Sequence, residues 1–537
     1  MDDNAVASWY DSTHLDNIQS AVNIASPGDM IFVYDGTYFE EIDVNKSVEL
    51  VGQSNTSTLV YGGFNVSADY VSISNFKITN GFEWDPDGTG KNGAYRSAIY
   101  VSSSFNSFQN NSIIQIVGGE GTDEYGFQKR GGTGGTASGL FLEDSFENVI
   151  SNNQIMGLTG GTGGLSNDYS KGGNGGIAVG VFCLNSNHTN VYGNTFNVIT
   201  GGLGGIGDQH KTKTNGDGGA GSGVYLQNSH QVTVNCNVML DIVGGNGGPH
   251  TRRGGIGGVG SGVYCLSSSQ NTIQYNIIVN ITGGNGERAA AVYDGGRGGI
   301  GSGIFLKTSS ENVISNENIS GITGGKGGDS NSGYTPSYGG TGGVGCGVYL
   351  ESSQENEVYS CEMDDVIGGD GGDKLGYAHA GIDQVSFGVY FADDCFDNDI
   401  SSNNSLEASP IIFYHNVSDY VIDDLMLIHT VNPTNLGKIV VVNSSNVTIS
   451  NCVISNFTAS GESVGKPGYL GCGLFVENSE KVKILSNSVT NIVGGSSYGI
   501  YMQKSSSNLL LNNTLSNILN LKDKSSAIFF FDTNSSK

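Results

Sequence analysis

The sequence predicts an all-β chain folded as a right-handed parallel β-helix, a solenoid whose coils stack along one axis. A strand phrase, glycine-aliphatic-aromatic-aliphatic, returns about every 41 residues in the central part. Near the C-terminus, Gly473 and Gly499 open successive phrases only 26 residues apart, and the glycine-rich segment between them nearly vanishes. A coil of about 22 to 26 residues with one insertion point accounts for both spacings. The longer repeats open their phrases at Gly139, Gly180, Gly223, Gly262, Gly303, Gly347 and Gly388.

The composition supports a stacked core and argues against some classes of binding partner. The 537 residues include 86 glycines, and 14 % of the residues are charged. Glycine-rich chains are often disordered, but here strand phrases rich in Val, Ile, Tyr and Phe recur at a fixed period and can bury a continuous core. The formal net charge of −27 argues against binding to nucleic acid or to an anionic membrane. We therefore expect an extracellular protein at a cell surface, without membrane insertion.

The opening of the chain predicts a cap for the solenoid. Residues 14–25 place apolar side chains at helical spacing, and Ser-Pro-Gly-Asp at 26–29 ends the helix. Residues 30–53 then alternate in the manner of strands. A helix at this place would cover the unpaired edge of the first coil. The expected divisions are a cap at 1–29, first coils at 30–117, coils with glycine-rich inserts at 118–387 and plain coils at 388–537.

These residues carry a family resemblance. The helix, SPGD and IFVYDGTYFEEIDVNKSVELVG resemble the start of NosD-like right-handed parallel β-helix proteins. NVTISNCVISNF at 446–457 and NLLLNNTLSNI at 508–518 resemble the same class, which is abundant among surface and adhesin-like proteins of methanogenic archaea. The resemblance covers about the first 80 and the last 150 residues and implies the fold more strongly than the function. The glycine-rich inserts depart from the family pattern, so the resemblance implies nothing about their role.

Two ladders of stacked side chains are expected along the coils. Alternation within the strand phrase sends the aliphatic residues inward and the aromatic residue outward. We expect the glycine inserts to fold back over these rings; the alternative is an open ladder that binds glycan by stacking. The rings belong to Tyr100, Phe141, Phe182, Tyr225, Tyr264, Phe305, Tyr349, Tyr390, Phe475, Tyr501 and Phe529. A second ladder, whose amides bond from coil to coil, is expected at Asn153, Asn194, Asn237, Asn276 and Asn487.

The glycine-rich inserts predict an ordered slab. Their outgoing and returning arms both read Gly-Gly-x, as at 201–206 and 216–220, which has the three-residue period of a polyproline-II-type helix. A single such loop would lose much conformational entropy on ordering. Arms stacked at the same point of successive coils can hydrogen-bond to one another and offset that loss. We therefore predict a slab of polyglycine-II arms beside the coils.

The tips that join the arms are the candidate binding sites. They differ from one another and concentrate His, Tyr, Arg and Lys in a chain that is otherwise poor in bases. Variable polar and aromatic tips on a constant scaffold are typical of a recognition surface. Contacts to another subunit, or plain solvated turns, would give the same pattern. The candidate binding residues are Tyr125, Tyr169, His210, His250, Tyr293, Tyr334, Tyr338, Tyr377 and His379.

No catalytic site is predicted. Polysaccharide-cutting enzymes of this fold need carboxylates placed for acid and base work. The weak candidates are Asp393 and Asp394, with Glu143, Asp144 and Glu351 at comparable positions after their strand phrases. In the sequence no lysine or arginine accompanies them, and turns favour aspartate in any case.

No cofactor is predicted either, and the cysteines are expected to be structural. A single GGDGGD segment at 368–373 resembles calcium-binding repeats, which leaves a structural Ca²⁺ as the alternative. The eight cysteines lack metal-ligand spacing. We expect them to pack as small buried hydrophobic residues, with a disulfide between neighbouring coils as the alternative.

The expected function is that of a non-catalytic extracellular cell-surface protein. It would serve as a structural subunit of a filament or surface layer, or as an adhesin for cells or glycans, acting through the glycine-rich loop face. Expected partners are further copies of the chain, other cell-surface proteins and glycans. The alternative is a polysaccharide lyase or glycoside hydrolase. The opening residues hold no signal peptide or membrane span, and the last strand phrase has no cap, which favours a segment of a longer chain.

Overall fold

A computed structural model describes most of the chain, in two compact units. The described residues are 14–84, 91–124, 130–166, 170–207, 215–249, 253–289, 293–332, 337–376, 380–381, 386–392, 395, 398–400, 405–406, 412–415, 418–423, 426–428, 437–458, 470–494, 496–520 and 525–531. Unit 1 comprises Met1–Phe305, Ile322–Gly345 and Gly368–Gln384. Unit 2 comprises Leu306–Gly321, Cys346–Ile367 and Val385–Lys537.

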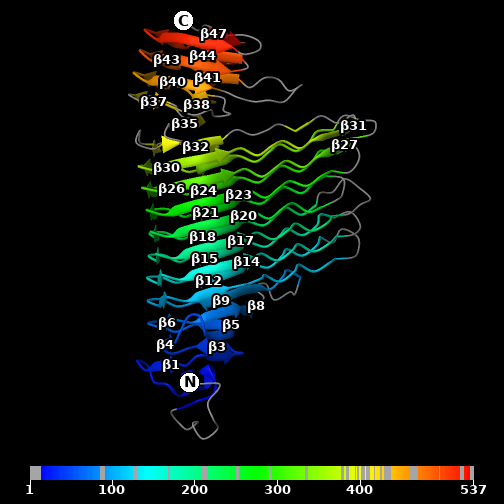
Figure 1. The fold of residues 1–537 in the computed structure, drawn as a ribbon, viewed down its shortest axis with the longest axis vertical. Helices are drawn as coiled ribbons and strands as arrows, with labels where there is room; N and C mark the ends of the chain where they lie inside the picture. Colours follow the sequence, from blue (N-terminus) through cyan, green and yellow to red (C-terminus); the bar gives the residue numbers. More distant parts are fainter. Residues whose placement is uncertain are drawn as a thin grey trace. The chain divides into compact units, whose positions relative to one another are not determined.

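Unit 1 is a right-handed parallel β-helix, as predicted, and each full coil passes through three sheets (Figure 1). Sheet A contains β1 Met30–Val33, β4 Glu49–Gly52, β6 Ser72–Ser74, β10 Ser107–Gln109, β13 Val149–Ser151, β16 Asn190–Tyr192, β19 Thr233–Asn235 and β22 Thr272–Gln274. Sheet B contains β2 Gly36–Tyr38, β5 Thr58–Val66, β7 Lys77–Asn80, β11 Ser112–Ile114, β14 Gln154–Thr159, β17 Thr195–Thr200, β20 Val238–Val243 and β23 Ile277–Thr282. Sheet C contains β3 Glu41–Val44, β5, β9 Tyr95–Val101, β12 Ala137–Glu143, β15 Ala178–Leu184, β18 Gly221–Gln227, β21 Gly260–Leu266 and β24 Gly301–Lys307.

Parallel pairing in strict register aligns like residues of successive coils. In sheet B, Ile155, Phe196, Met239 and Ile278 lie opposite one another and are fully buried. The strands alternate between these inward residues and outward residues, which is the pattern of a half-buried sheet. The core of unit 1 is therefore a stack of apolar columns, one side chain per coil.

The turns between sheets rely on left-handed backbone at fixed positions. Asn152, Asn185 and Asn228 have φ values of 55°, 50° and 50°. Asparagine tolerates this region better than most residues because its short side chain bonds locally. Many of the asparagines thus allow the left-handed turns between the sheets of each coil.

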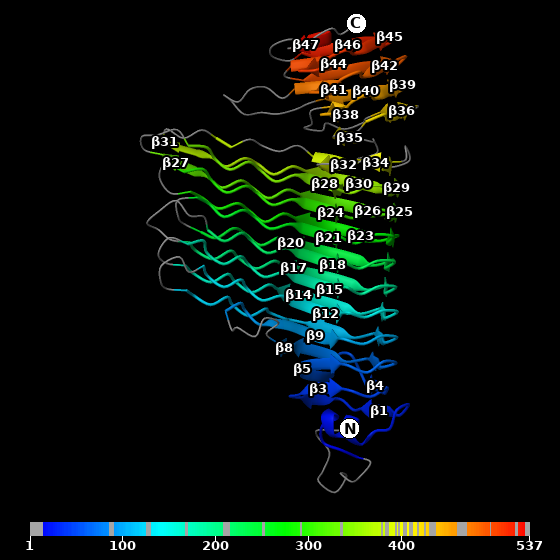
Figure 2. The ribbon, with the colours of Figure 1, turned by 180° about the vertical axis from the view of Figure 1, so that it is seen from behind.

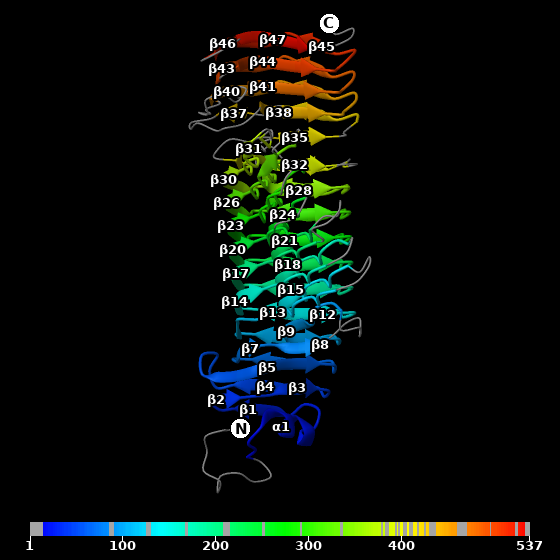
Figure 3. The same cartoon turned by 90° about the vertical axis from the view of Figure 1, so that its right-hand side faces the viewer.

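The predicted capping helix is present, in shortened form. Helix α1 spans Ile18–Ile24 and lies at the N-terminal end of the first coil (Figure 3). The Asn17 side chain accepts the Ser20 N–H at its start, and Ile18 and Val22 are fully buried. The carboxylate of Glu40 accepts the N–H groups of Ile18 and Gln19, at 2.8 and 2.9 Å, which joins the cap to the first coil.

The asparagine ladder is confirmed. The backbone N–H and the side-chain Nδ2 of Asn194 both donate to Oδ1 of Asn237, each at 3.0 Å. Asn153 donates to Asn194 in the same way, and Asn237 to Asn276. These amides are buried in unit 1 and carry the coil-to-coil bonding into the core. The ladder also includes Asn111, which the repeat spacing did not single out.

The aromatic ladder is also present, but its rings are buried. Phe141, Phe182, Tyr225 and Tyr264 are 2 to 9 % exposed, with successive ring centroids 4.5 to 4.9 Å apart. An open, glycan-stacking ladder is therefore excluded for these rings. The expected cover was a slab folded back over them, yet Figures 1 and 2 show the arms running sideways from the coils. At the start of the ladder the cover is Trp84, whose ring centroid lies 5.3 Å from that of Phe141. Trp84 belongs to β8 Phe82–Trp84, which pairs antiparallel with β9.

Unit 2, taken by itself, has the same parallel pairing. One series contains β28 Gly345–Glu351, β32 Ser386–Ala392, β35 Ile412–His415, β38 Gly437–Val442, β41 Leu470–Glu477, β44 Ser496–Gln503 and β47 Ser525–Phe531. Two others contain β36 Val421–Asp423, β39 Thr448–Ser450, β42 Lys483–Leu485 and β45 Leu509–Leu511, and β37 Met426–Ile428, β40 Val453–Thr458, β43 Ser488–Gly494 and β46 Thr514–Asn520. Shorter pairings join β25 Val313–Ser315, β29 Glu357–Tyr359 and β33 Asp399–Ile400, and β30 Glu362–Ile367 with β34 Ser405–Leu406. Three strands contain residues of both units: β24, β28 and β26 Asn318–Thr323.

The cysteines are structural, and none of the eight lies in a disulfide. Seven are buried, as expected, and Cys236 is exposed. Burial raises the pKa of the Cys183 thiol to about 12, because the thiolate would have to be desolvated. The alternative of an inter-coil disulfide is therefore wrong.

Candidate functional site

Two layers of glycine-rich arms extend from one side of unit 1 (Figures 1 and 2). Arms of the outgoing layer follow sheet B, and arms of the return layer lead into sheet C. The outgoing layer consists of residues 118–124, 160–166, 201–207, 244–249, 283–289, 324–329 and 368–373. The return layer consists of residues 130–136, 170–177, 215–220, 253–259, 294–300, 338–344 and 380–381. Near the tips of two arms, β27 Ser330–Ser332 pairs in parallel with β31 Lys374–Gly376.

Backbone hydrogen bonds join the arms in two directions. The first glycine of a Gly-Gly-x triplet donates to the next coil within its own layer, as Gly204 does to the carbonyl of Asn246, at 3.0 Å. The second glycine donates to the other layer, as Gly202 does to Gly176 at 2.8 Å. Gly219 of the return layer then donates to Gly202 at 2.8 Å. The predicted ordered slab is thus present as a two-layer backbone network.

Both glycines of the triplet are sterically required, while the third position is open. A Cβ on Gly201 would lie 2.1 Å from the carbonyl oxygen of Gly219, and one on Gly202 would lie 2.0 Å from that of Gly161. Most side chains therefore project from the third position, onto the outer surface of each layer, although Thr122, Asn215 and Glu287 occupy glycine positions near the tips. These surfaces are the outgoing face and the return face.

Asparagine and aspartate at the third position have a structural role. The Asn246 side chain accepts the backbone N–H of Asn285, and Asn285 accepts that of Lys326, both at 2.8 Å. Asp217 accepts the N–H of Ile256 in the return layer, at 3.2 Å. Each of these side chains satisfies the one N–H of the next triplet that no glycine carbonyl reaches. Part of the acidic composition is therefore explained by the slab itself.

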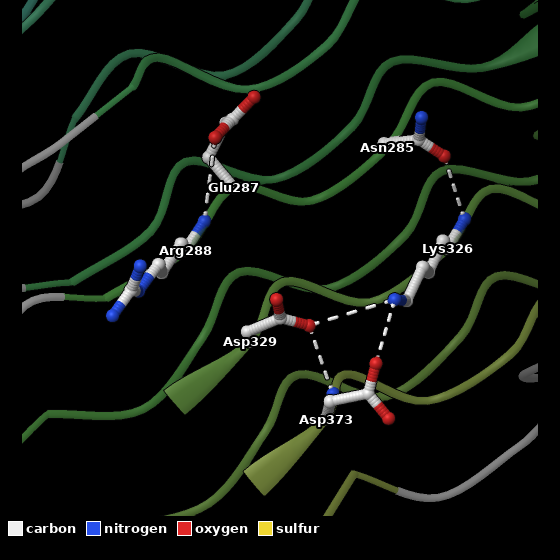
Figure 4. A network of polar contacts seen from close by, with 6 residues as sticks. All are labelled: Asn285, Glu287, Arg288, Lys326, Asp329 and Asp373. Carbon is white, nitrogen blue, oxygen red and sulfur yellow. Dashed lines mark hydrogen bonds and ion pairs between the residues drawn. The ribbon is translucent and has the colours of Figure 1, made fainter. Parts of the chain in front are cut away.

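The C-terminal half of the outgoing face carries a charged network (Figure 4). The Lys326 ammonium donates to Asp373 at 3.0 Å and lies 3.6 Å from Asp329. Asp329 also accepts the N–H of Asp373, at 2.9 Å. The hydrogen bond to Asp373 raises the pKa of Lys326. Asp329 and Asp373 thus share the ammonium group of Lys326. Asp373 is the last residue of the GGDGGD segment considered for calcium, so its carboxylate is engaged in this ion pair.

Arms 160–166 and 201–207 of the outgoing face carry no charged residue, whereas arm 118–124 before them carries Glu120, Asp123 and Glu124. Leu165 and Leu203, at third positions of successive arms, are 37 and 47 % exposed. The return face instead mixes charge with apolar residues: Lys171 forms an ion pair with Asp217 at 2.5 Å, while Ile256 is 45 % exposed.

The structure places two of the nine candidate binding residues, and it brings them together. Tyr338 and Tyr293 belong to neighbouring tips. The carboxylate of Asp294, the residue after Tyr293, accepts the Tyr338 N–H at 2.9 Å, and the N–H of Gly295 donates to the Tyr338 carbonyl. Tyr338 is 55 % exposed. The remaining candidates lie outside the described residues: Tyr125, Tyr169, His210, His250, Tyr334, Tyr377 and His379.

The carboxylates considered for catalysis are engaged in structural contacts where the structure describes them. Glu143 accepts the Tyr100 hydroxyl at 2.5 Å, and Asp144 accepts the Asn185 amide at 2.9 Å. Glu351 forms an ion pair with Lys307 at 2.6 Å, which corrects the expectation that no base accompanies these acids. The sequence missed this pair because Lys307 lies a full coil away. Asp393 and Asp394 lie outside the described residues.

The described residues include neither a metal cluster nor a membrane-spanning helix. Within the described ranges, no three His, Cys, Asp or Glu side chains gather as a metal site. No described helix has both the length and the apolar character needed to span a membrane.

Comparison with known proteins gives similarity of structure without similarity of sequence. No protein-family model matches the chain, and no curated protein is similar to it in sequence. DFA-IIIase from Arthrobacter chlorophenolicus A6 is 11 % identical over 71 % of this chain and 86 % of its own, with a TM-score of 0.33. The Streptococcus pneumoniae surface protein and adhesin PfbA is 12 % identical over 94 % of this chain and 91 % of its own, with a TM-score of 0.28. The periplasmic alginate epimerase AlgG is 12 % identical over 72 % of this chain and 83 % of its own, with a TM-score of 0.23. These are parallel β-helix proteins and include both enzymes and an adhesin, and at such scores they carry no argument for either function.

Proposed function

We propose that this chain is a non-catalytic extracellular cell-surface protein that works through its glycine-arm slab, as an adhesin or as a structural subunit of a filament or surface layer. The observation that carries the proposal is the two-layer backbone network, which holds side chains at defined positions far from the coils. Its three-residue hydrogen-bond period is the one expected of polyglycine II, and that description is part of the proposal. So is membership of the NosD-like class of archaeal surface proteins.

The recognition function is assigned to the tips. A ligand-binding loop normally loses conformational entropy when it orders around a ligand, which weakens binding. Here the hydrogen bond that Tyr338 donates to Asp294 and the one that it accepts from Gly295 already order the chain beside an exposed ring. A preorganised aromatic ring with polar neighbours suits the stacking and hydrogen bonding of a sugar. Glycans on a cell surface are therefore the proposed ligand class.

A matched pair of tyrosine variants tests this function. Tyr338 and Tyr275 are 55 and 56 % exposed, but Tyr275 lies on a coil turn and not on the slab. Tyr338→Ser is expected to reduce binding to whole cells and to a glycan array at least about tenfold, as for the loss of an aromatic anchor. Tyr275→Ser should leave binding unchanged.

Equal binding by both variants would contradict a role for this tip. The alternative, a polysaccharide lyase or glycoside hydrolase, predicts new reducing ends or unsaturated sugars when the protein is incubated with polysaccharides. Asp393→Asn should then abolish the activity, and that result would replace the proposed function.

A further inference from the structure

The outer side chains of sheet B and of the outgoing layer form one continuous surface. Strand β14 runs directly into arm 160–166 and β17 into arm 201–207, so that outward residues of the strand are followed by outward residues of the arm. The apolar patch is defined here as the residues on the β14, β17, β20 and β23 coils of this surface that are large, hydrophobic and 37 to 48 % exposed. These are Met156, Leu165, Val198, Leu203 and Ile277.

The apolar patch is almost free of charge in a strongly charged molecule. In the four segments of this surface, 154–166, 195–207, 238–249 and 277–289, the charged residues are Asp241 and, near the tip of the last arm, Glu287 and Arg288; arm 118–124, which adjoins the surface, carries Glu120, Asp123 and Glu124. The whole chain has a formal net charge of −27. A surface with few charges lowers the repulsion between two copies that each carry this net charge.

Val198 supplies a second and independent observation. Its φ is 53°, a left-handed conformation that a β-branched residue rarely adopts. In the neighbouring coils the same position holds Gly157, Asp241 and Asn280, which tolerate that conformation. The valine is 48 % exposed, so it offsets little of this strain through burial within the chain. A strained apolar side chain that faces water points to a contact outside the chain.

The size of the surface suits a stable dimer. Four coils at about 4.8 Å each, by six strand residues and six arm residues at about 3.2 Å each, give an area on the order of 700 Å². A standard protein interface buries about 800 Å² on each partner, and the largest apolar patch of an ordinary monomer is about 300 to 600 Å². The hydrogen-bonded backbone keeps this surface regular, as packing against an equal surface requires.

We propose that the apolar patch binds the same patch of a second copy of this chain about a two-fold axis. The inference rests on the proposed function in taking the slab as the working surface, and it names one partner. A two-fold contact is closed, so it gives a dimer in which the tips of both copies stay available.

The test compares two faces of the slab. Leu203 on the outgoing face and Ile256 on the return face occupy the same triplet position and are 47 and 45 % exposed. Aspartate is compatible with that position, since Asp217 and Asp329 already occupy it. Sedimentation velocity across a concentration series should show a dimer of the intact chain that added salt strengthens, because salt screens the repulsion between the copies. Leu203→Asp should weaken the dimer at least about tenfold, while Ile256→Asp should change it by less than about threefold.

A variant of Val198 separates the contact from general stability. Val198→Asn relieves the backbone strain, so it should raise the thermal midpoint of a dilute, monomeric sample. The same variant should weaken the dimer. If Val198 had only a structural role, Val198→Asn would change the thermal midpoint and the strength of the dimer in the same direction.

The proposal is overturned by a monomer at every concentration and salt level, by equal effects of the two aspartate variants, or by assemblies larger than a dimer that survive Leu203→Asp. These outcomes are distinct from failure of the proposed function. A monomer whose Tyr338→Ser variant loses glycan binding would overturn the dimer alone, while a dimer that binds no cells or glycans would overturn the recognition function alone.

Discussion

At the scale of the residue, the slab depends on which of three positions lacks a side chain. The second glycine of each triplet donates across the layers and sits against a carbonyl of the neighbouring coil. The third residue faces water, and leucine, asparagine, lysine and aspartate all occupy that position. Composition alone shows abundant glycine; the contacts show that at Gly201 and Gly202 a Cβ would lie about 2 Å from a backbone carbonyl oxygen, whereas positions near the tips also hold Thr122, Asn215 and Glu287.

Gly202→Ala and Leu203→Ala should therefore differ sharply. The alanine Cβ at position 202 would lie 2.0 Å from the Gly161 carbonyl oxygen, so neighbouring arms would have to separate. We expect Gly202→Ala to lower the free energy of unfolding by at least about 2 kcal/mol, in the range of overpacked cores. Leu203→Ala, one residue later on the surface, should change it by less than about 0.5 kcal/mol. Denaturant titration followed by circular dichroism measures both, and equal losses would refute the assignment of the two positions.

At the scale of the element, each arm is stabilised by its neighbours and not by its own contacts. Side-chain acceptors such as Asn285 complete the bonding that the glycine carbonyls leave open. These bonds run from one coil to the next, over about 40 residues of sequence, and so they act across arms and not along them.

Amide hydrogen exchange at Lys326 tests this role of the third position. Asn285→Leu removes the acceptor at 2.8 Å from the Lys326 N–H, which should then exchange at least about tenfold faster, as for the loss of one hydrogen bond. Asn285→Asp keeps an oxygen in place and should preserve the protection. The amide of Gly325, which donates to the Gly299 carbonyl, serves as an internal reference. Unchanged exchange at Lys326 in Asn285→Leu would show that the side chain is not the acceptor in solution.

At the scale of the whole molecule, buried thiols couple stability to alkaline pH. Burial raises the pKa of the Cys183 thiol from its ordinary value near 9 to about 12, and raises the pKa of Cys265 and Cys472 as well. Above about pH 9 the unfolded chain loses these protons while the folded chain keeps them. Stability should therefore be fully present below about pH 9 and fall at higher pH, by up to about 1.4 kcal/mol per pH unit for each thiol.

Thermal midpoints between neutral pH and pH 10.5 measure this dependence. Cys183→Val retains an apolar side chain of similar size and removes one titrating group, so its midpoint should fall less steeply above about pH 9. Cys236→Val, at the exposed cysteine, should keep the slope of the original chain. Parallel slopes for all three proteins would show that the buried thiol does not contribute.

Repeat spacing and local pattern were enough to predict the coil period, the capping helix, the asparagine ladder and the presence of an ordered glycine slab. Each of these follows from local pattern, because residues at a fixed spacing occupy one position in successive coils. Which side chains meet across coils could be learned from the folded chain alone. The fold directed the glycine arms sideways from the coils, placed Lys307 beside Glu351, made Asn285 an acceptor, and gathered Leu165, Val198 and Leu203 on one surface. The physical reason is that stacking brings together residues about 40 positions apart, and their shared exposure to water is a property of the stacked surface and not of any single repeat.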